Sequence, residues 1–550
     1  MSDWSKRLPE AIDAAIRNVA AFGDTDLFPD PIEAVLFNQA PRKTRQAVIE
    51  LHQSFSKTGR LSTPETLRAL FPVGQFGYRL GSQIDPVWNL YLLSLVILAG
   101  PEIESARTSK SEHAVFSYRF IAPDNSGRIF DPENGWRAFS TQVMSLCSGH
   151  SFAVVCDIAD FYHRINSKMV ISALLKCGVA KSLALRIGSV LSKLGTNVFG
   201  LPVGGPASRL LAEAILIPVD ELLKSKGVQF CRFVDDIRLF SSSEAHSRLQ
   251  LADLSMELLQ RKFSLQKTKT RILASKDLLA ELKMGQNMEL APTKVGALGY
   301  VELRRMLLAK SLFDPYSGLR AQREKRLEEF AAQPGAIQFL RREFSKPIVN
   351  PALARNALSA LTFMETNEAA ESLIFLIDPR RQRAVLPVIG KLLQVLTAQS
   401  SRLDLESKHK LRKLLMALLQ DKTSAIQLPA IQALGIRALQ KLPAGSDPEV
   451  TQMLREKFQT PQQTLVRKEI LTLYGIWGME QELQRLIQGP KLGSAWERRA
   501  LALGTALTPS LKRKTNKVGS PNKDICEKLC TNWLTSSKSS TFLRHQANAL

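Results

Sequence analysis

Residues 228–240 read Val-Gln-Phe-Cys-Arg-Phe-Val-Asp-Asp-Ile-Arg-Leu-Phe, a pair of acids between two apolar runs. Apolar runs of this length around turn-forming residues predict two strands joined by a tight turn, with Asp235 and Asp236 at its tip. An ordinary hairpin turn is the alternative, because Asp is common in turns that have no chemical role.

A third carboxylate has a similar frame upstream. Residues 152–156, Phe-Ala-Val-Val-Cys, form a continuous apolar run that predicts a buried strand, and the run leads directly into Asp157. Carboxylates delivered by two strand ends to one place form a hard-oxygen site for Mg²⁺. Two such ions, roughly 3.5–4 Å apart, activate a 3′-hydroxyl and stabilise a leaving pyrophosphate. The pattern predicts nucleotidyl transfer, with Asp157, Asp235 and Asp236 as catalytic residues and metal ligands.

Four segments resemble, in the same order, the motifs of reverse transcriptases. Residues 157–162 resemble the first palm motif, and residues 233–236 its aromatic-x-Asp-Asp box. Between them, Gly-Leu-Pro-Val-Gly-Gly-Pro at residues 200–206 is similar to the Gly-Leu-Pro-x-Gly motif, and residues 263–270 resemble the following Leu-x-Leu-x-x-x-Lys-Thr segment. The resemblance implies an α/β reverse-transcriptase fingers-palm domain. Val203 departs from the Gln of retroviral and group II intron enzymes, which weakens the analogy to their templated synthesis.

The resemblance also implies the cofactor and two residues beside it. Two Mg²⁺ ions are expected, with Mn²⁺ as a substitute, and the Ile158 carbonyl is a candidate backbone ligand to the metal. The ring of Tyr162 would pack against the sugar of the incoming nucleotide and exclude a 2′-hydroxyl. A core aromatic is the alternative role for Tyr162.

Four more residues are predicted to bind the nucleotide by resemblance. Arg119, in a predicted finger strand over residues 115–120, would hold the triphosphate with help from Arg107. Gly204 would let backbone approach the nucleotide closely, and Lys269 would neutralise or protonate the leaving pyrophosphate. The alternative for the three cationic side chains is an ordinary solvated surface.

Composition limits the class of protein. The 550 residues include 74 Lys plus Arg and 51 Asp plus Glu, and the formal net charge of +23 predicts attraction to a polyanion. A solubilising surface is the alternative.

The six cysteines form no Cys-x-x-Cys pair and have no ordered His partners, so neither a zinc site nor a disulfide framework is indicated. Reduced thiols and a cytoplasmic location are expected.

The sequence contains no apolar targeting segment and predicts no membrane association. The most apolar stretch, residues 88–99, is shorter than the ~20 residues that cross a bilayer. It predicts a core helix, with Asp85 as its cap and Pro86 in its first turn.

The chain divides into three predicted parts: an N-terminal helical segment (residues 1–75), the fingers and palm (76–310) and an α-helical domain (311–550). In the last part apolar residues recur at helical spacing, with breaks at Pro379, residues 400–401, 444–446 and 489–490. Helix pairs of this length predict an all-α HEAT-like repeat domain. A plain helical bundle predicts the same periodicity and stays open.

The motifs and the long helical C-terminal part resemble the bacterial defence-associated, abortive-infection reverse transcriptases, including the AbiK-like enzymes. This resemblance implies antiphage defence, homo-oligomeric assembly, and synthesis of single-stranded DNA from dNTPs that is protein-primed and template-independent. Two alternatives stay open. One is an RNA-templated reverse transcriptase that uses a bound non-coding RNA, as retron enzymes do. The other is a nucleic-acid-binding scaffold with an unused polymerase site, against which the intact acids argue.

A protein primer would need a hydroxyl that reaches the site. Tyr474 is one candidate and Tyr316 is a second, just before the helical part. Tyr474 lies in the apolar run Leu-Thr-Leu-Tyr-Gly, where Tyr in a helix is commonly a core residue.

Overall fold

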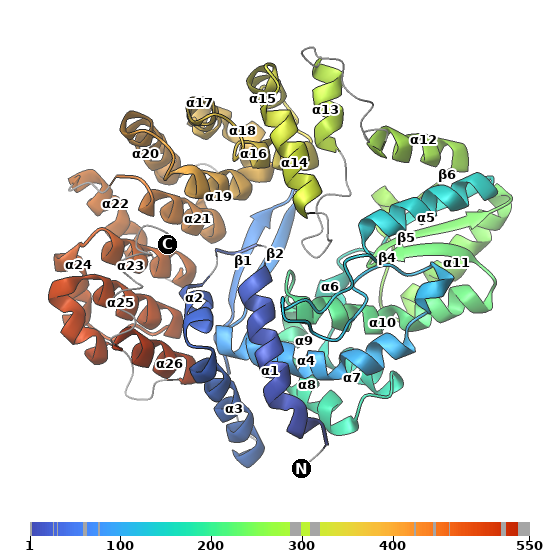
Figure 1. Cartoon of the computed structure of the whole chain (residues 1–550), viewed down its shortest axis with the longest axis horizontal. Coiled ribbons are helices and arrows are strands. Elements are labelled where there is room, and N and C mark those ends of the chain that lie inside the picture. The colour runs from blue at the N-terminus through green and yellow to red at the C-terminus, as the bar shows by residue number, and fades with distance from the viewer. Residues whose placement is uncertain are drawn as a thin grey trace.

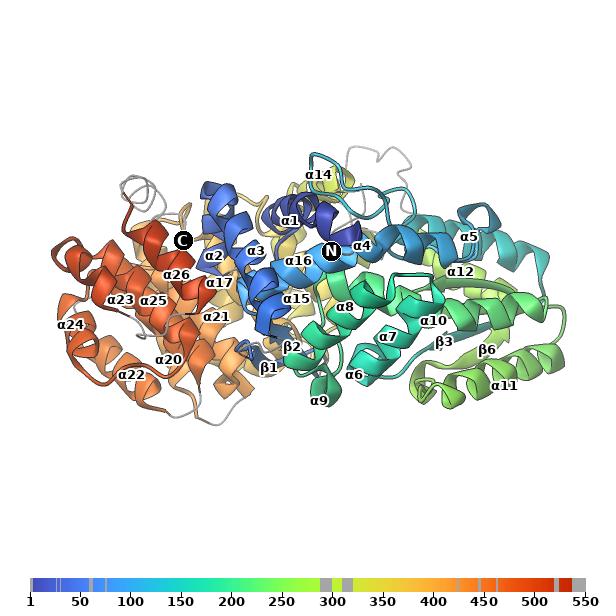
Figure 2. The ribbon, with the colours of Figure 1, turned by 90° about the horizontal axis from the view of Figure 1, so that it is seen from below.

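The computed structural model describes most of the chain. The described residues are 3–25, 27–29, 31–58, 63–74, 77–286, 299–308, 320–422, 425–443, 447–460, 463–518 and 524–536. They form three neighbouring parts: the palm, a central N-terminal part, and an arc of helices that curves around the other side (Figures 1 and 2).

The central part begins with three helices, α1 (Asp3–Phe22), α2 (Ile32–Gln39) and α3 (Pro41–Thr58). Helix α1 is amphipathic, and its apolar stripe, which includes Leu8, Ile12 and Val19, is buried. Helices α1 and α3 both pack on α4 (Pro86–Ala106).

Helix α4 is the core helix that the sequence predicts. The Asp85 carboxylate accepts hydrogen bonds from the backbone N–H groups of Val87 and Trp88, and Pro86 occupies the first turn. Among the described residues α4 is the one helix long and apolar enough to cross a membrane, but 89% of its most apolar window is buried inside the protein. Its apolar surface is therefore covered by protein.

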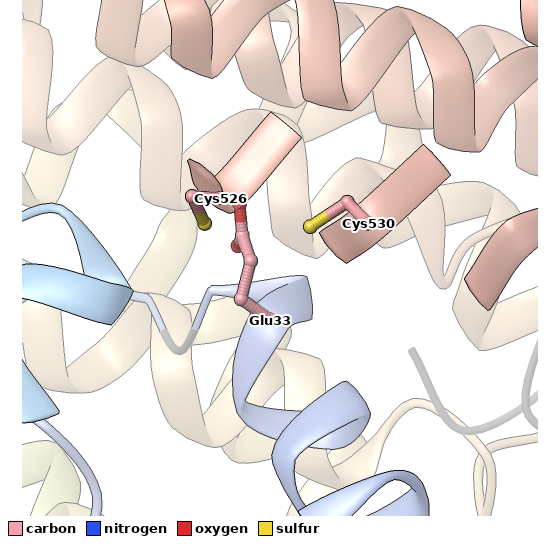
Figure 3. A group of neighbouring side chains, drawn as sticks. All are labelled: Glu33, Cys526 and Cys530. Atoms are coloured by element: carbon pink, nitrogen blue, oxygen red, sulfur yellow. The ribbon is translucent and has the colours of Figure 1, made fainter. Parts of the chain in front are cut away.

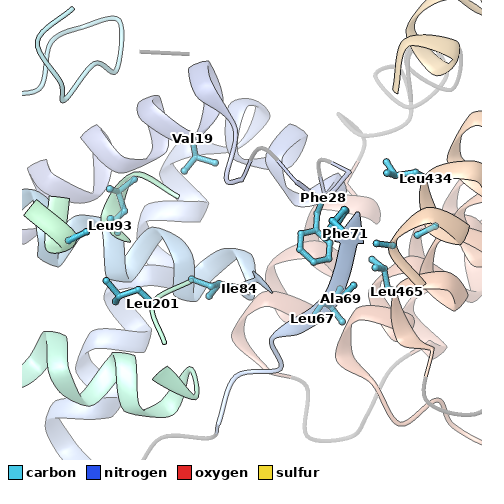
Figure 4. Close-up of a cluster of buried hydrophobic side chains, with 14 of the residues drawn as sticks. Val19, Phe28, Leu67, Ala69, Phe71, Ile84, Leu93, Leu201, Leu434 and Leu465 are labelled. Atoms are coloured by element: carbon cyan, nitrogen blue, oxygen red, sulfur yellow. The ribbon is translucent and has the colours of Figure 1, made fainter. Parts of the chain in front are cut away.

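A two-stranded hairpin separates the N-terminal helices from α4. Its strands β1 (Leu67–Pro72) and β2 (Tyr78–Gln83) pair antiparallel, with Leu67 opposite Gln83. The predicted domain boundary between residues 75 and 76 falls inside this hairpin, and is wrong because the two strands form one unit. Leu67, Ala69 and Phe71 alternate along β1 into a core shared with Leu434 and Leu465 of the helical arc (Figure 4).

The palm is built on a four-stranded antiparallel sheet in the order β4-β5-β3-β6. Its strands are β3 (Phe152–Asp157), β4 (Gln229–Phe233), β5 (Asp236–Ser241) and β6 (Arg271–Ala274). The predicted hairpin, formed by β4 and β5, and the predicted buried strand β3 are both confirmed. Residues 153–156 of the central strand β3 are all buried, which is expected where both faces of a sheet are covered.

The palm region also contains helices, of which α5 (Trp136–Gly149), α10 (Pro206–Ser225), α11 (Glu244–Gln260) and α12 (Ser275–Gln286) pack on the strands. The others are η1 (Lys110–Glu112), α6 (Phe161–Arg164), α7 (Ser167–Lys176), α8 (Lys181–Lys193), α9 (Thr196–Phe199) and η2 (Lys267–Lys269). Pro206 opens α10 as predicted. The finger strand predicted over residues 115–120 is wrong: this segment makes only single bridges, Val115 to Arg232 and Phe120 to Phe130.

From residue 300 onward every described element is helical. The elements are α13 (Tyr300–Leu308), α14 (Arg320–Ala331), α15 (Ala336–Glu343), α16 (Pro351–Ala360), α17 (Thr366–Ile377), η4 (Pro379–Arg381), α18 (Gln382–Val385), η5 (Leu386–Val388), α19 (Ile389–Gln399), α20 (Leu405–Gln420), η6 (Ala425–Gln427), α21 (Pro429–Gln440), α22 (Pro448–Gln459), α23 (Thr464–Ile476), α24 (Glu480–Gln488), α25 (Ala495–Leu507), η7 (Pro509–Lys517) and α26 (Ile525–Leu534). The predicted breaks at 400–401 and 489–490 fall between helices, and Pro379 ends α17 by opening the short 3₁₀ helix η4. Residues 444–446 lie outside the described residues.

Alternate helices of the arc stack on one another. Helices α19, α21, α23 and α25 form one row, in which each contacts the next, and α15, α17 and α20 form a second row. The rows curve around the central part (Figure 1). The far end returns to the N-terminal helices, because α26 packs on α2 and α3.

Candidate active site

The structure brings the three predicted acids to the same end of neighbouring strands. Asp157 is the last residue of β3, and it lies directly opposite Asp236, the first residue of β5. Residues opposite each other in an antiparallel pair project from the same face. Asp235 lies in the turn just before Asp236, and its carbonyl accepts a hydrogen bond from the Ile158 N–H at 3.2 Å.

The three carboxylates create a concentrated negative charge. Burial raises the pKa of Asp235 to about 7, and the charges of Asp157 and Asp236 add to the rise. Such a shift means that the ionised form lacks sufficient compensation from the protein. A bound cation would supply that compensation.

Lys269, predicted to act on the leaving pyrophosphate, lies beside the acids. Its Nζ lies 2.7 Å from Asp157 Oδ2, although 61% of its side chain is exposed. Burial lowers the pKa of Lys269, but the bond to Asp157 and the charges of all three acids outweigh this effect and raise it. Two backbone bonds hold the segment in place: Gln266 N–H to the Asp157 carbonyl at 2.7 Å, and Ala159 N–H to the Ser264 carbonyl at 2.8 Å.

The donor set fits hard divalent cations. Three carboxylates, and the backbone carbonyl of Ile158 as the candidate fourth ligand next to Asp157 in the sequence, are the oxygen ligands that Mg²⁺ prefers. Within the described ranges, the one group of three ligating side chains whose atoms all lie within 4.8 Å of one another is elsewhere. The carboxylate oxygens of the three acids therefore do not all lie within 4.8 Å of one another. This is compatible with two metal ions roughly 3.5–4 Å apart, because each ion then uses a different subset of the ligands.

A buried polar network holds the turn that carries Asp235. Val234 has a φ of 55°, in the left-handed region that a β-branched residue rarely adopts. Its N–H donates to Ser117 Oγ at 2.9 Å, and its carbonyl accepts from Arg232 Nη1 at 3.1 Å. Both backbone polar groups of the strained residue are thus fixed by side chains.

These two side chains belong to a charge-balanced cluster. Glu213 accepts hydrogen bonds from Ser117 Oγ at 2.6 Å and from Arg107 Nη2 at 2.8 Å, and it pairs with Arg232 Nη1 at 3.0 Å. Asp220 accepts from Arg232 Nε and Nη2, both at 2.7 Å. The four charged side chains are almost fully buried, and their two positive and two negative charges cancel. Removing one partner of such a cluster is costly.

Sequence reasoning missed this network. Glu213 and Asp220 lie among the apolar residues of α10, and acids at otherwise buried positions of a helix are the signal that would have found them. Arg232 could have been found in the same way, because it is a charged residue within the otherwise apolar and buried strand β4.

Arg107 and Arg119 do not have the environment that was predicted. Arg107 is held in the network, and Arg119 pairs with Glu104 Oε1 at 2.6 Å and donates to the Thr108 carbonyl at 2.9 Å. Their side chains are 0% and 2% exposed. Arginines buried and paired in this way cannot hold a triphosphate, so they support the fold around the site.

Tyr162 lies near the acids, on α6. Its pKa is raised well above the usual value, first by burial, and Tyr118 and Asp235 are among the neighbours that contribute. The Gly-Leu-Pro motif packs against this tyrosine, because the Leu201 N–H donates to the Tyr162 carbonyl at 2.9 Å. A contact between Tyr162 and the sugar of the nucleotide requires that the ring lie near the acids, and its position near Asp235 meets that requirement.

Two glycines of the same motif adopt left-handed backbone conformations. Gly200 has a φ of 71°, and a Cβ there would lie 2.3 Å from the His163 Cα. Gly204 has a φ of 107° and lies in the partly exposed loop before α10. Only glycine adopts these conformations readily.

The two candidate primers have different outcomes. Tyr474 is only 1% exposed in α23, and its hydroxyl has no hydrogen-bond partner among the described residues. A side chain enclosed in this way cannot present its oxygen to a nucleotide, so the Tyr474 prediction is not supported. Tyr316 lies outside the described residues.

Comparison with known proteins adds a family. Residues 108–301 match the family model described as reverse transcriptase (RNA-dependent DNA polymerase), a range that includes all three acids and Lys269. Among 56 matching chains of solved structures is telomerase from Candida albicans in complex with a TWJ fragment of telomeric RNA. That chain is 9% identical, with a TM-score of 0.27, and the alignment covers 81% of this chain and 68% of that chain. No curated protein matches. Residues 108–301 therefore form a reverse transcriptase domain, and the chain is a nucleotidyltransferase of the reverse transcriptase type.

Proposed function

We propose that the chain synthesises DNA from dNTPs by two-metal nucleotidyl transfer. The observation that carries the proposal is the meeting of Asp157, Asp235 and Asp236 at the ends of β3 and β5, beside Lys269. When bound, two Mg²⁺ or Mn²⁺ ions would supply activation of a 3′-hydroxyl and stabilisation of pyrophosphate. The acids, with the Ile158 carbonyl, would hold the ions.

The remaining residues would orient the nucleotide and move charge. Lys269 would leave Asp157 when cations take its place, and its exposed ammonium would then neutralise or protonate the departing pyrophosphate. Tyr162 would lie under the sugar, and Gly204 would admit the nucleotide close to backbone. The cluster around Glu213 would keep the turn at Asp235 rigid, which preserves the geometry that catalysis depends on.

The central test replaces the acids without changing their size. The double variant Asp235→Asn/Asp236→Asn removes the charge that binds the metals, so nucleotide incorporation should collapse while the thermal unfolding curve stays close to that of the parent. Asp253→Asn, on the outer helix α11, is the matched control and should leave synthesis unchanged. Undiminished synthesis by the double variant would overturn the proposal.

Two modes of synthesis differ in the hydroxyl that accepts the first nucleotide: a side chain of the protein in one, and the 3′ end of a nucleic acid in the other. We favour the protein-primed, template-independent mode because of the resemblance in sequence motifs, although the burial of Tyr474 leaves Tyr316 as the one named candidate. RNA-templated synthesis on a bound non-coding RNA is the second candidate. Purified protein is incubated with single dNTPs and no nucleic acid, and the product is then treated with protease or nuclease. A protease-sensitive shift and a nucleotide-bearing peptide in mass spectrometry support protein priming, whereas synthesis that requires RNA supports the alternative.

The wider role is also a proposal. We infer a cytoplasmic enzyme of antiphage defence that works as a homo-oligomer, with the stacked helices from α14 to α26 as a HEAT-like repeat domain. The support is the motif resemblance, the excess of basic residues and the row-on-row stacking of the helices. Phage plating on bacteria that express the parent or the Asp235→Asn/Asp236→Asn variant tests the role, and equal plaque counts would argue against it.

A further inference from the structure

Two cysteines and a glutamate that are far apart in the sequence meet in the folded chain. Cys526 and Cys530 lie one turn apart on α26, and Glu33 projects from α2 toward them (Figure 3). The two sulfur atoms and a carboxylate oxygen all lie within 4.8 Å of one another. The three residues are only 2–4% exposed.

The spacing of the cysteines suits a shared ligand. Residues four apart on a helix project from the same face. In a tetrahedral zinc site with Zn–S bonds of roughly 2.3 Å, two sulfurs lie about 3.8 Å apart. The measured limit of 4.8 Å between the ligand atoms is compatible with that spacing.

Arg499 provides a second, independent observation. Its Nε pairs with Glu33 Oε1 at 2.5 Å and its Nη1 with Asp85 Oδ2 at 3.0 Å, but its Nη2 is buried and has no hydrogen-bond partner within the described ranges. An unpaired guanidinium N–H of this kind costs free energy. Arg499 also lines a small cavity with Glu33 and Cys530. A thiolate at Cys526 or Cys530 would provide the missing acceptor.

We propose that Glu33, Cys526 and Cys530 bind one thiophilic divalent cation, with zinc as the natural occupant. Both thiols release their protons to solvent as the metal–sulfur bonds form, so the two positive charges gained equal the two protons lost. The Glu33 carboxylate supplies the third ligand, and a water molecule in the cavity supplies the fourth. The charge of the buried cluster is then the same with and without the metal.

Such a site would join the two ends of the described chain. Helix α26 closes the helical arc and packs on α2, while Arg499 connects Glu33 to Asp85, the cap of the core helix α4. A metal at this position would tie the arc to the N-terminal part. Its role is structural, because it lies on different elements from the polymerase acids.

The site is tested on the full-length protein, purified without chelators and then dialysed against Zn²⁺. Elemental analysis should give one zinc per chain, and replacement by Co²⁺ should give thiolate-to-cobalt charge-transfer absorption. The variant Cys526→Ser/Cys530→Ser should lose both signals. Cys147→Ser/Cys177→Ser, which changes one cysteine on α5 and one that caps the end of α7, should keep them.

The outcomes are decisive without any assay of synthesis. Less than a tenth of an equivalent of zinc after loading, or cobalt absorption that survives Cys526→Ser/Cys530→Ser, would overturn the site. If that variant does not fold, the parent protein gives the answer alone: both thiols should resist alkylation when zinc is present and react after a strong chelator is added. Equal reactivity under the two conditions would refute the inference. The polymerase proposal is unaffected by either result.

Discussion

The substitution Ser117→Ala tests whether the buried network holds the catalytic turn. Ser117 Oγ accepts the Val234 N–H at 2.9 Å and donates to Glu213 at 2.6 Å, and the residue is fully buried. Loss of the hydroxyl leaves a backbone N–H without its acceptor and a buried carboxylate with one donor fewer. Hydrogen bonds contribute about 0.5–1.5 kcal/mol each, and about 1.5–3 kcal/mol when one partner is charged, so the two together amount to roughly 2–4 kcal/mol.

Part of that loss is offset by relaxation of the backbone. Val234 is held at a φ of 55°, which stores about 1–3 kcal/mol of strain. Without Ser117 the turn has less reason to keep this conformation, and Asp235, the next residue, would move with it. We expect the free energy of unfolding to fall by about 1–3 kcal/mol. A displacement of about 1 Å at the acid would lower synthesis about 100-fold.

The assay compares two measurements on the same preparation. Urea denaturation gives the free energy of unfolding, and the rate of dNTP incorporation is measured at a temperature where both proteins are folded. Ser94→Ala is the matched control, because Ser94 is also buried but its hydroxyl bonds only to the Leu90 carbonyl of its own helix, at 2.6 Å. The control should synthesise normally. Parental rates in folded Ser117→Ala would refute the role assigned to the network.

Three further substitutions test other parts of the site and the fold. Gly200→Ala should destabilise the protein by well over about 1 kcal/mol in urea denaturation, because the new Cβ would meet the His163 backbone at 2.3 Å. Gly178→Ala is its control, with a φ of 84° and nothing within 4 Å, and an equal loss in both variants would argue against the packing. Tyr162→Ala should raise ribonucleotide incorporation relative to deoxynucleotide incorporation, and an unchanged ratio would return Tyr162 to the core. Burial, with Arg186 as a second cause, lowers the pKa of His52 to about 4. The unfolded chain therefore binds more protons between about pH 4 and 6.5, so stability should rise with pH across that window and then level off. His52→Gln should flatten this rise in the melting temperature, and an identical pH profile would exclude His52 as its source.

Local patterns were sufficient to predict the elements that carry the acids. The apolar run before Asp157 predicts a strand because burial on both faces of a sheet favours a continuous apolar run. The runs on either side of Asp235 and Asp236 predict a hairpin because turn-forming residues separate them. The cap at Asp85 and the proline after it are also local, since a helix start depends on a few adjacent residues. The role of Lys269 at the pyrophosphate was expected from the family resemblance, whereas its contact with Asp157 is a finding of the structure.

Tertiary structure alone decided the environment of the remaining residues. Arg107 and Arg119 look like surface cations in the sequence, but contacts with Glu104 and Glu213 bury them. The hairpin β1–β2 joins residues on both sides of the predicted boundary at residue 75, because strand pairing depends on contacts that local sequence does not reveal. Tyr474 is buried by neighbouring helices, and the spacing of apolar residues along its own helix does not show how completely they cover it.

The cysteines show the largest difference between what the sequence predicts and what the tertiary structure contains. In the sequence the cysteines form no Cys-x-x-Cys pair and have no ordered His partners, so their spacing argues against a metal site. In the structure the return of α26 to α2 places Cys526 and Cys530 against Glu33, a residue almost five hundred positions away. Sequence patterns determined the strands that carry the acids and the core helix α4, because those elements depend on neighbours along the chain. Which distant side chains share a buried space is decided only when the arc of helices closes, because that depends on the packing of the whole chain.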